Sequence, residues 1–216
     1  MDAVVFDLDG VLVDSERTWD EVRRAVVAEH GGIWNVEATR AQQGMSTHEW
    51  ARYLVEELGA ELTPERIAEV VISRMVKRYA EGPPMIPGAA ETVRRVASKY
   101  PVAIASSSPP VLIKAFLDAS ELTGLVNVAL SSEQVAAGKP APDVYIEAAR
   151  RLGFEATVCG AVEDTTNGLR SALAAGMTVY AVPNPHFPPD PAVVAQAAAV
   201  LMDISELPSA LGIVAS

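Results

Sequence analysis

The sequence predicts an α/β fold: a doubly wound, Rossmann-like parallel sheet that carries an inserted all-helical cap domain. Three observations support this. Short, valine-rich apolar runs recur along the 216-residue chain, helical patterns separate most of them, and the first interval is far longer than the others. Continuous apolar runs are typical of strands that are covered on both faces, as in a parallel sheet. Strands that alternate with helices indicate the doubly wound architecture.

Six apolar runs are the expected strands of this sheet. They span residues 3–6, 102–105, 126–130, 157–162, 178–182 and, as the weakest pattern, 199–202. Two helical patterns between them, residues 142–152 and 167–175, stop at Gly153 and Gly176. Glycine just after a helix accepts the left-handed backbone of a C-cap. The pattern therefore places helices between successive strands.

The first interval, residues 8–101, contains no convincing strand and predicts a helical insert. Its first helix is expected over residues 15–30, because Trp19, Val22 and Val26 then lie on one face.

Two more helices are expected in the insert. Thr47 can cap a helix that stops at Gly59, and Thr63 followed by Pro64 begins another that ends at Gly82. Threonine is a favoured N-cap residue, and proline is favoured at the first helical position.

The insert defines the expected domain organisation. Residues 15–82 would form the helical cap domain, and residues 1–14 and 83–216 the α/β core domain. The proline-rich residues 82–88 would be a stiff linker, since proline restricts its own backbone and that of its predecessor. Ligands of open parallel sheets bind beyond the carboxyl ends of the strands. A module inserted after the first strand can therefore cover such a site as a lid.

Charge and composition exclude several classes of protein. The chain has 17 Lys plus Arg against 28 Asp plus Glu, and its net charge of −11 opposes nucleic acid and anionic membranes. The single cysteine, Cys159, rules out an internal disulfide and a cysteine-based zinc cluster. The N-terminus lacks a signal peptide's basic lead-in, and no run approaches the roughly 20 apolar residues of a membrane span. We expect a cytoplasmic protein, either a monomer or a weak dimer.

Carboxylates follow two of the expected strands. Asp7 and Asp9 come after the first, where Gly10 permits a sharp turn, and Glu163 and Asp164 come after the fourth. These acids could simply end a strand or be solvated charges at a helix N-terminus. A carboxylate at a buried strand end is costly, however, unless it is paired or bound to a metal. Oxygen ligands without histidine or cysteine suit a hard cation, and Mg²⁺ is expected.

Two further segments could bind an anion. Ser106, Ser107 and Ser108 follow the second expected strand, where hydroxyl and backbone N–H groups can hold a phosphate. The alternative for this turn is structural capping. Lys139, in a Gly-Lys-Pro turn, is either a solvated surface charge or the cation that balances the acids and a bound phosphate.

Four motifs resemble those of one enzyme family. They are DLDGVLVDS at residues 7–15, the serine turn at 106–108, GKPAPDVY at 138–145 and VEDTTNG at 162–168. Their order and spacing resemble the haloacid dehalogenase-like (HAD) hydrolase superfamily, over residues 4 to 182. The insert resembles the helical cap of its phosphatase and β-phosphoglucomutase branch. The resemblance implies a hydrolase of phosphoric monoesters.

The resemblance also implies roles for the matching residues. Asp7 would be the nucleophile that forms an aspartyl-phosphate, and Asp9 the general acid and later the general base. The phosphoryl oxygens would be held by Ser106, Ser107 and the catalytic Lys139. The Mg²⁺ ligands would be Asp7, the main-chain carbonyl of Asp9, Asp164 and, directly or through water, Glu163. The family's dehalogenases lack a second aspartate like Asp9, so its presence favours phosphoryl transfer.

We expect a Mg²⁺-dependent phosphatase acting on a small phosphorylated metabolite, with cap residues selecting the substrate. The candidate specificity residues are Trp19, Gly44, Met45, Thr47 and His48. A β-phosphoglucomutase-like sugar-phosphate mutase is the alternative, but such mutases carry a histidine at the position of Trp19 and an arginine near Thr47. A non-catalytic phosphate-binding relative is a further alternative, which the intact Asp7 and Asp9 oppose.

Overall fold

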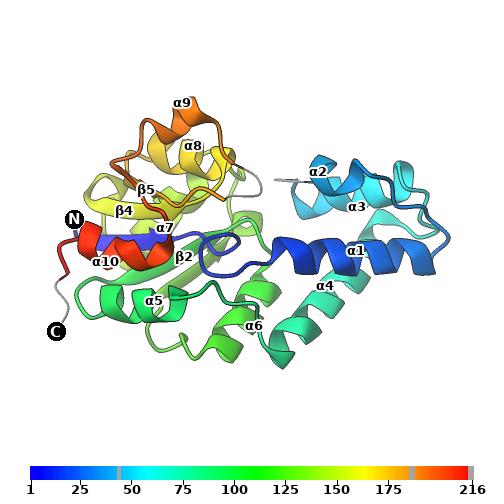
Figure 1. Cartoon of the computed structure of the whole chain (residues 1–216), viewed down its shortest axis with the longest axis horizontal. Helices are drawn as coiled ribbons and strands as arrows, with labels where there is room; N and C mark the ends of the chain where they lie inside the picture. Colours follow the sequence, from blue (N-terminus) through cyan, green and yellow to red (C-terminus); the bar gives the residue numbers. More distant parts are fainter. Residues whose placement is uncertain (43–44, 185–187, 214–216) are drawn as a thin grey trace.

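The computed structural model describes residues 1–42, 45–184 and 188–213, and it contains the expected parallel sheet (Figure 1). Within these residues, six strands pair in the order β3-β2-β1-β4-β5-β6, and every pairing is parallel. The strands are β1 (Ala3–Phe6), β2 (Val102–Ser106), β3 (Val128–Ser131), β4 (Cys159–Glu163), β5 (Thr178–Ala181) and β6 (Ala199–Val200). The predicted fold class is confirmed.

Some strand boundaries differ from the prediction. The third strand begins at Val128 rather than at residue 126, because the Val126 amide donates to the Leu122 carbonyl in a turn. The fourth begins at Cys159, because Ala156–Val158 form a 3₁₀ turn. In both cases the predicted run includes residues of a turn at the start of the strand, which an apolar pattern cannot distinguish from residues of the strand itself.

Helices cover both faces of the sheet (Figure 1). Val4 and Phe6 of β1 belong to one buried cluster with α5 and α6, whereas Val5 belongs to another with α7 and α8. These helices are α5 (Ala89–Ala97), α6 (Pro110–Ser120), α7 (Asp143–Leu152) and α8 (Thr166–Ala174), and the short α9 (Pro191–Val194) and α10 (Leu207–Ala210) follow. Successive side chains of a strand point to opposite faces, so two apolar clusters explain the continuous apolar runs.

The segment between β1 and α5 contains helices and, in its described residues, no strand of the sheet. These helices are α1 (Glu16–Glu29), α2 (Ala38–Ala41), α3 (Thr47–Glu56) and α4 (Pro64–Glu81), and we call them the cap helices. Thr63 caps α4 as predicted, by accepting from the Arg66 amide. Thr47 is not the cap of α3, because Ser46 and Glu49 form a reciprocal capping box one residue earlier.

Two antiparallel segments connect the cap helices to the sheet. Val13 and Met85 form a bridge, the Asp14 amide donates to the Pro84 carbonyl, and the Ile86 amide donates to the Leu12 carbonyl. Helix α4 also packs against α6 of the core. The paired connections lie close to the domain limits expected at residues 14 and 83, and the division into two domains there remains a prediction.

Cys159 is fully buried in β4, as expected of a small core residue. Among the residues described, no helix combines the length and the apolar character that crossing a bilayer requires.

Candidate active site

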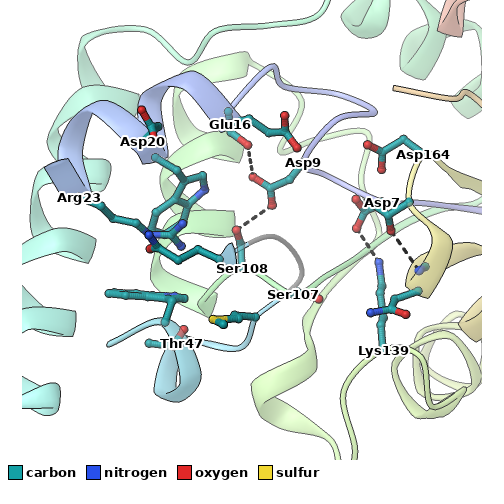
Figure 2. A pocket seen from close by; sticks show the side chains of 18 of the residues that line it. Asp7, Asp9, Glu16, Asp20, Arg23, Thr47, Ser107, Ser108, Lys139 and Asp164 are labelled. Carbon is teal, nitrogen blue, oxygen red and sulfur yellow. Dashed lines mark hydrogen bonds and ion pairs between the residues drawn. The ribbon is translucent and has the colours of Figure 1, made fainter. Parts of the chain in front are cut away.

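The carboxyl ends of β1 and β4 bring the expected acids together (Figure 2). Phe6 pairs with Val162, so Asp7 and Glu163 leave neighbouring strands at the same edge. The Asp7 amide extends this register by donating to the Val162 carbonyl. One carboxylate oxygen from each of Asp7, Glu163 and Asp164 lies within 4.8 Å of the other two. Two segments that are distant in sequence thus form one acidic cluster.

Lys139 lies inside this cluster rather than on the surface. Its Nζ is 2.6 Å from Asp7 Oδ1 and 2.7 Å from Glu163 Oε1, and only 6% of its side chain is exposed. The ammonium also donates to the Ala105 carbonyl and lies 4.9 Å from the centre of the Tyr145 ring. Burial favours the neutral amine, but Asp7 and Glu163 outweigh it and raise the pKa of Lys139. The alternative of a solvated lysine is therefore wrong.

Glu163 is held rigidly from both sides. Its Oε1 accepts from Lys139 and from the Tyr145 hydroxyl, and its Oε2 accepts from the amides of Asp164 and Thr165 at the start of α8. The residue is wholly buried. It is therefore not a solvated helix-terminal charge.

The acidic cluster has the composition of a site for a hard divalent cation. Asp164 Oδ1 is buried and has no hydrogen-bond partner among the described residues. Burial raises the pKa of Asp164, and the neighbouring Glu163 and Asp7 raise it further. Burial likewise raises the pKa of Asp7 to about 8, although Lys139 opposes this change. A cation held by Asp7 and Asp164, with Glu163 beside them, would supply the missing partner of Asp164 and stabilise the carboxylate forms.

Asp9 faces the pocket beside this cluster, and three serines hold its carboxylate. Ser15 Oγ donates to Asp9 Oδ1, while Ser106 Oγ at 3.2 Å and Ser108 Oγ at 2.7 Å donate to Oδ2. Gly10 has a φ of +82°, and a Cβ there would lie 2.0 Å from Asp164 Oδ2. The sharp turn after β1 thus requires glycine, as the sequence indicated.

The serine turn divides into two parts. Ser106 is fully buried, is not among the pocket-lining residues, and accepts from the Ser108 amide. Ser107 and Ser108 line the pocket. Ser106 is therefore engaged with Asp9 in this structure, and its predicted contact with phosphate, like that of Ser107, remains a prediction.

Cap and core residues line one pocket together. Among the predicted specificity residues, Trp19, Met45 and Thr47 line it, and Thr47 Oγ1 donates to Glu133 Oε1 of the core at 2.7 Å. Gly44 lies outside the described residues. His48 is exposed and is not among the residues that line the pocket, because it follows Thr47 in the first turn of α3 and points in another direction. Its role in substrate choice remains a prediction.

Several residues of this site were not predicted from the sequence. Arg23, Trp34 and Gln42 line the cap side of the pocket. Arg23 could have been found, because it follows Trp19 by one helical turn and so shares its face of α1. Tyr145 is the last residue of the GKPAPDVY motif, but only the fold reveals its contact with Glu163.

Comparison with known proteins agrees with this geometry. Residues 1–176 match the family model of haloacid dehalogenase-like hydrolases. Hexitol phosphatase B from Escherichia coli strain K12 is 31% identical over 196 residues, covering 88% of this chain and 86% of that protein. Fructose-1-phosphate phosphatase YqaB from the same strain is 28% identical over 177 residues, covering 81% of this chain and 92% of that protein.

A solved structure shares the whole architecture. The crystal structure of CbbY from Rhodobacter sphaeroides, in complex with phosphate, matches this chain with a TM-score of 0.84 and 26% identity over 96% of each chain. Since the family model spans most of the sequence and the family's motifs meet in one pocket, the chain belongs to the phosphatase branch of the haloacid dehalogenase-like hydrolases.

Proposed function

We propose that this enzyme is a Mg²⁺-dependent phosphatase that hydrolyses a small phosphomonoester through an aspartyl-phosphate on Asp7. The observation that carries the proposal is the setting of the Asp7 carboxylate. A buried ammonium, Lys139 Nζ, lies 2.6 Å from one of its oxygens, and the unpartnered Asp164 carboxylate lies in the same cluster. A nucleophilic carboxylate and a phosphate dianion can approach each other only where positive charge lies between them.

In the first step, an Asp7 oxygen attacks phosphorus, and the bond between phosphorus and the ester oxygen breaks. Asp9 donates its proton to that oxygen, so the alcohol leaves in neutral form and Asp9 becomes a carboxylate. The hydroxyls of Ser15 and Ser108 hold Asp9 beside the pocket, and Lys139 orients Asp7.

In the second step, Asp9 accepts a proton from a water molecule as that water attacks phosphorus. The bond between phosphorus and the Asp7 oxygen breaks, which releases inorganic phosphate and restores both aspartates. When bound, Mg²⁺ supplies positive charge that stabilises the transferring phosphoryl group. The names of the relatives support this assignment, because hexitol phosphatase B and YqaB are phosphatases and the CbbY crystal holds phosphate.

Hydrolysis of p-nitrophenyl phosphate with and without Mg²⁺ tests this proposal. We expect phosphate release that requires Mg²⁺ and that falls by about 10⁴-fold or more in Asp7→Asn, since the nucleophile is lost. Asp7→Asn should fold, because it removes one charge from a crowded cluster. Asp118→Asn, at an exposed site on α6, is the matched control and should retain full activity.

Other outcomes would replace the proposal. Bisphosphate-activated conversion of a hexose 1-phosphate to its 6-phosphate would identify a mutase. Binding of inorganic phosphate without turnover of any phosphomonoester in a broad panel would identify a non-catalytic relative.

A further inference from the structure

Arg23 presents a cation on the cap side of the pocket, across from Asp7 and Lys139 (Figure 2). Its guanidinium carbon lies 4.5 Å from the centre of the Trp19 ring and 4.7 Å from that of Trp50. Its buried Nε has no hydrogen-bond partner, and no carboxylate in the described chain forms an ion pair with it. The pocket therefore contains an unpaired cation that none of the proposed chemical steps uses.

Asp20, the pocket-lining acid three residues before Arg23, is already engaged. Asp20 accepts from Arg24 Nη2 at 2.9 Å and from the Thr39 hydroxyl. Burial lowers the pKa of Arg23 to about 9, while Asp20 and Asp9 oppose the change, so the side chain stays charged at neutral pH. The two indoles lie against the guanidinium, so the N–H groups that point away from them are the part left to donate to a ligand.

The cap residues that line the pocket form one wall of it, which we call the cap wall. Two more polar groups of the cap wall are buried without partners. Gln42 donates from Nε2 to the Ala38 carbonyl, but its Oε1 accepts no hydrogen bond from any described residue. The Trp34 indole N–H likewise has no partner in the described part of the chain. Both residues line the same pocket as Arg23. The wall thus offers unsatisfied donors and an unsatisfied acceptor, an arrangement that costs stability unless a ligand completes it.

We infer that Arg23 is a specificity-determining residue that binds hydroxyl groups of the leaving group, together with Gln42, and that the substrate is a sugar or alditol monophosphate. The inference rests on the proposed phosphatase function. A hydroxyl group can accept from Arg23 and donate to Gln42, so a polyhydroxylated chain can satisfy both.

Two other leaving groups fit this wall less well. A second phosphate or a carboxylate only accepts hydrogen bonds, so it would leave Gln42 Oε1 unpaired, and it would meet the carboxylates of Glu16 and Asp20, which also line the pocket. A nucleobase would need a free aromatic face, whereas Arg23 already stacks on Trp19 and Trp50.

The test compares substrates with and without hydroxyl groups in the part that leaves. The catalytic efficiency, kcat/KM, is measured for glucitol 6-phosphate and glucose 6-phosphate and divided by that for acetyl phosphate. Arg23→Met keeps an unbranched chain against the two indoles but removes every donor. The ratio should therefore fall by about 10- to 100-fold, the value of a hydrogen bond to a charged group. Gln42→Leu should lower the ratio independently, in case Arg23→Met does not fold.

Arg17→Met is the matched control. Arg17 is on the same helix, its side chain is 86% exposed and paired with Glu21, and it does not line the pocket, so the ratio should not change. An unchanged ratio in both Arg23→Met and Gln42→Leu would overturn the inference. An Arg23-dependent preference for a sugar bisphosphate or a nucleoside monophosphate would overturn it as well.

Failure of the phosphatase proposal is distinguishable from failure of this inference. If the wild-type enzyme hydrolyses neither acetyl phosphate nor the sugar phosphates, the proposed function fails. Calorimetric titration then measures the affinity of the wild-type chain and of Arg23→Met for glucitol 6-phosphate, which tests whether the cap wall binds hydroxyl groups. Binding that weakens at least about 10-fold in Arg23→Met supports the hydroxyl subsite, whereas equal affinity or no binding to the wild-type chain overturns it.

Discussion

Lys139 is the residue on which the charge balance of the acidic cluster depends. A buried ammonium that contacts Asp7 and Glu163 at once offsets part of the cost of burying both carboxylates. Removing one partner of a buried ion pair typically destabilises a protein by about 3–5 kcal/mol, because a charge is left unpaired. Lys139 therefore contributes to the folded state as well as to the proposed chemistry, and loss of activity in its variants must be measured together with stability.

Glu16 gives a residue-scale prediction on pH. Burial, with Asp14 and Asp9 nearby, raises the pKa of Glu16 to about 7 from an ordinary 4.5. Between these values the folded state binds the proton more tightly than the unfolded state, so the free energy of unfolding falls as pH rises from about 4.5 to about 7. Glu16→Gln should remove this part of the pH dependence, which urea unfolding across pH 4 to 8 measures.

The control for this prediction is Glu21→Gln on the same helix, where the side chain is exposed and paired with Arg17. Its unfolding should keep the wild-type pH dependence. Parallel pH curves for Glu16→Gln and wild type would contradict the assigned shift.

At the scale of elements, the start of α8 is built to hold Glu163. The amides of Asp164 and Thr165 donate to its carboxylate, and the Thr165 hydroxyl caps the helix by accepting from the Gly168 amide. Gly168 lies so close that a Cβ would come within 1.8 Å of Glu163 Oε1. A glycine in the first turn of this helix therefore makes room for the buried carboxylate.

Gly168→Ala should displace Glu163 and weaken both its contacts and the helix cap. We expect a loss of about 1–3 kcal/mol in the free energy of unfolding, as for other overpacked sites, together with lower activity. Gly124→Ala is the control, since a Cβ there meets no atom within 4 Å. Equal unfolding free energies for the two variants would refute the packing argument.

At the scale of the whole molecule, the cap helices and the core together line the pocket. The buried apolar cluster on one face of the sheet continues into the cap helices, and the hydrogen bond from Thr47 to Glu133 joins the two across the pocket. The strand ends and loops of the core supply the acids and Lys139, while the cap helices supply pocket-lining residues such as Trp19 and Arg23. Under the proposed function, reaction chemistry and substrate choice would therefore be separated between the two parts of the chain.

Metal binding should stabilise the whole fold, because the ion binds the folded acidic cluster. At 100 times its dissociation constant, such a ligand adds about 2.7 kcal/mol to the free energy of unfolding. We expect MgCl₂ to raise the melting temperature of the wild-type chain and to have little effect on Asp164→Asn, which loses a ligand charge. Asp118→Asn should respond like wild type. An equal rise in Asp164→Asn would argue against this metal site.

Much of the core was predictable from the sequence. Valine-rich runs predicted a parallel sheet because strands covered on both faces are apolar throughout, and paired acids at two strand ends predicted one cluster because parallel strands end at a common edge. The cap was harder to predict. Ser46 rather than Thr47 caps α3, because Ser46 forms the capping box with Glu49. His48 is exposed, because a shift of one residue along a helix changes the direction in which a side chain points.

By itself, the sequence determined the fold class, the family motifs and the acidic residues of the site, since these depend on local pattern and strand order. Only the tertiary structure decided that Lys139 is buried between two acids, that Ser106 contacts Asp9, and that Arg23 reaches the pocket unpaired. These are contacts between segments far apart in the chain. Their geometry follows from how helices and strands pack, which the periodicity of any single segment does not contain.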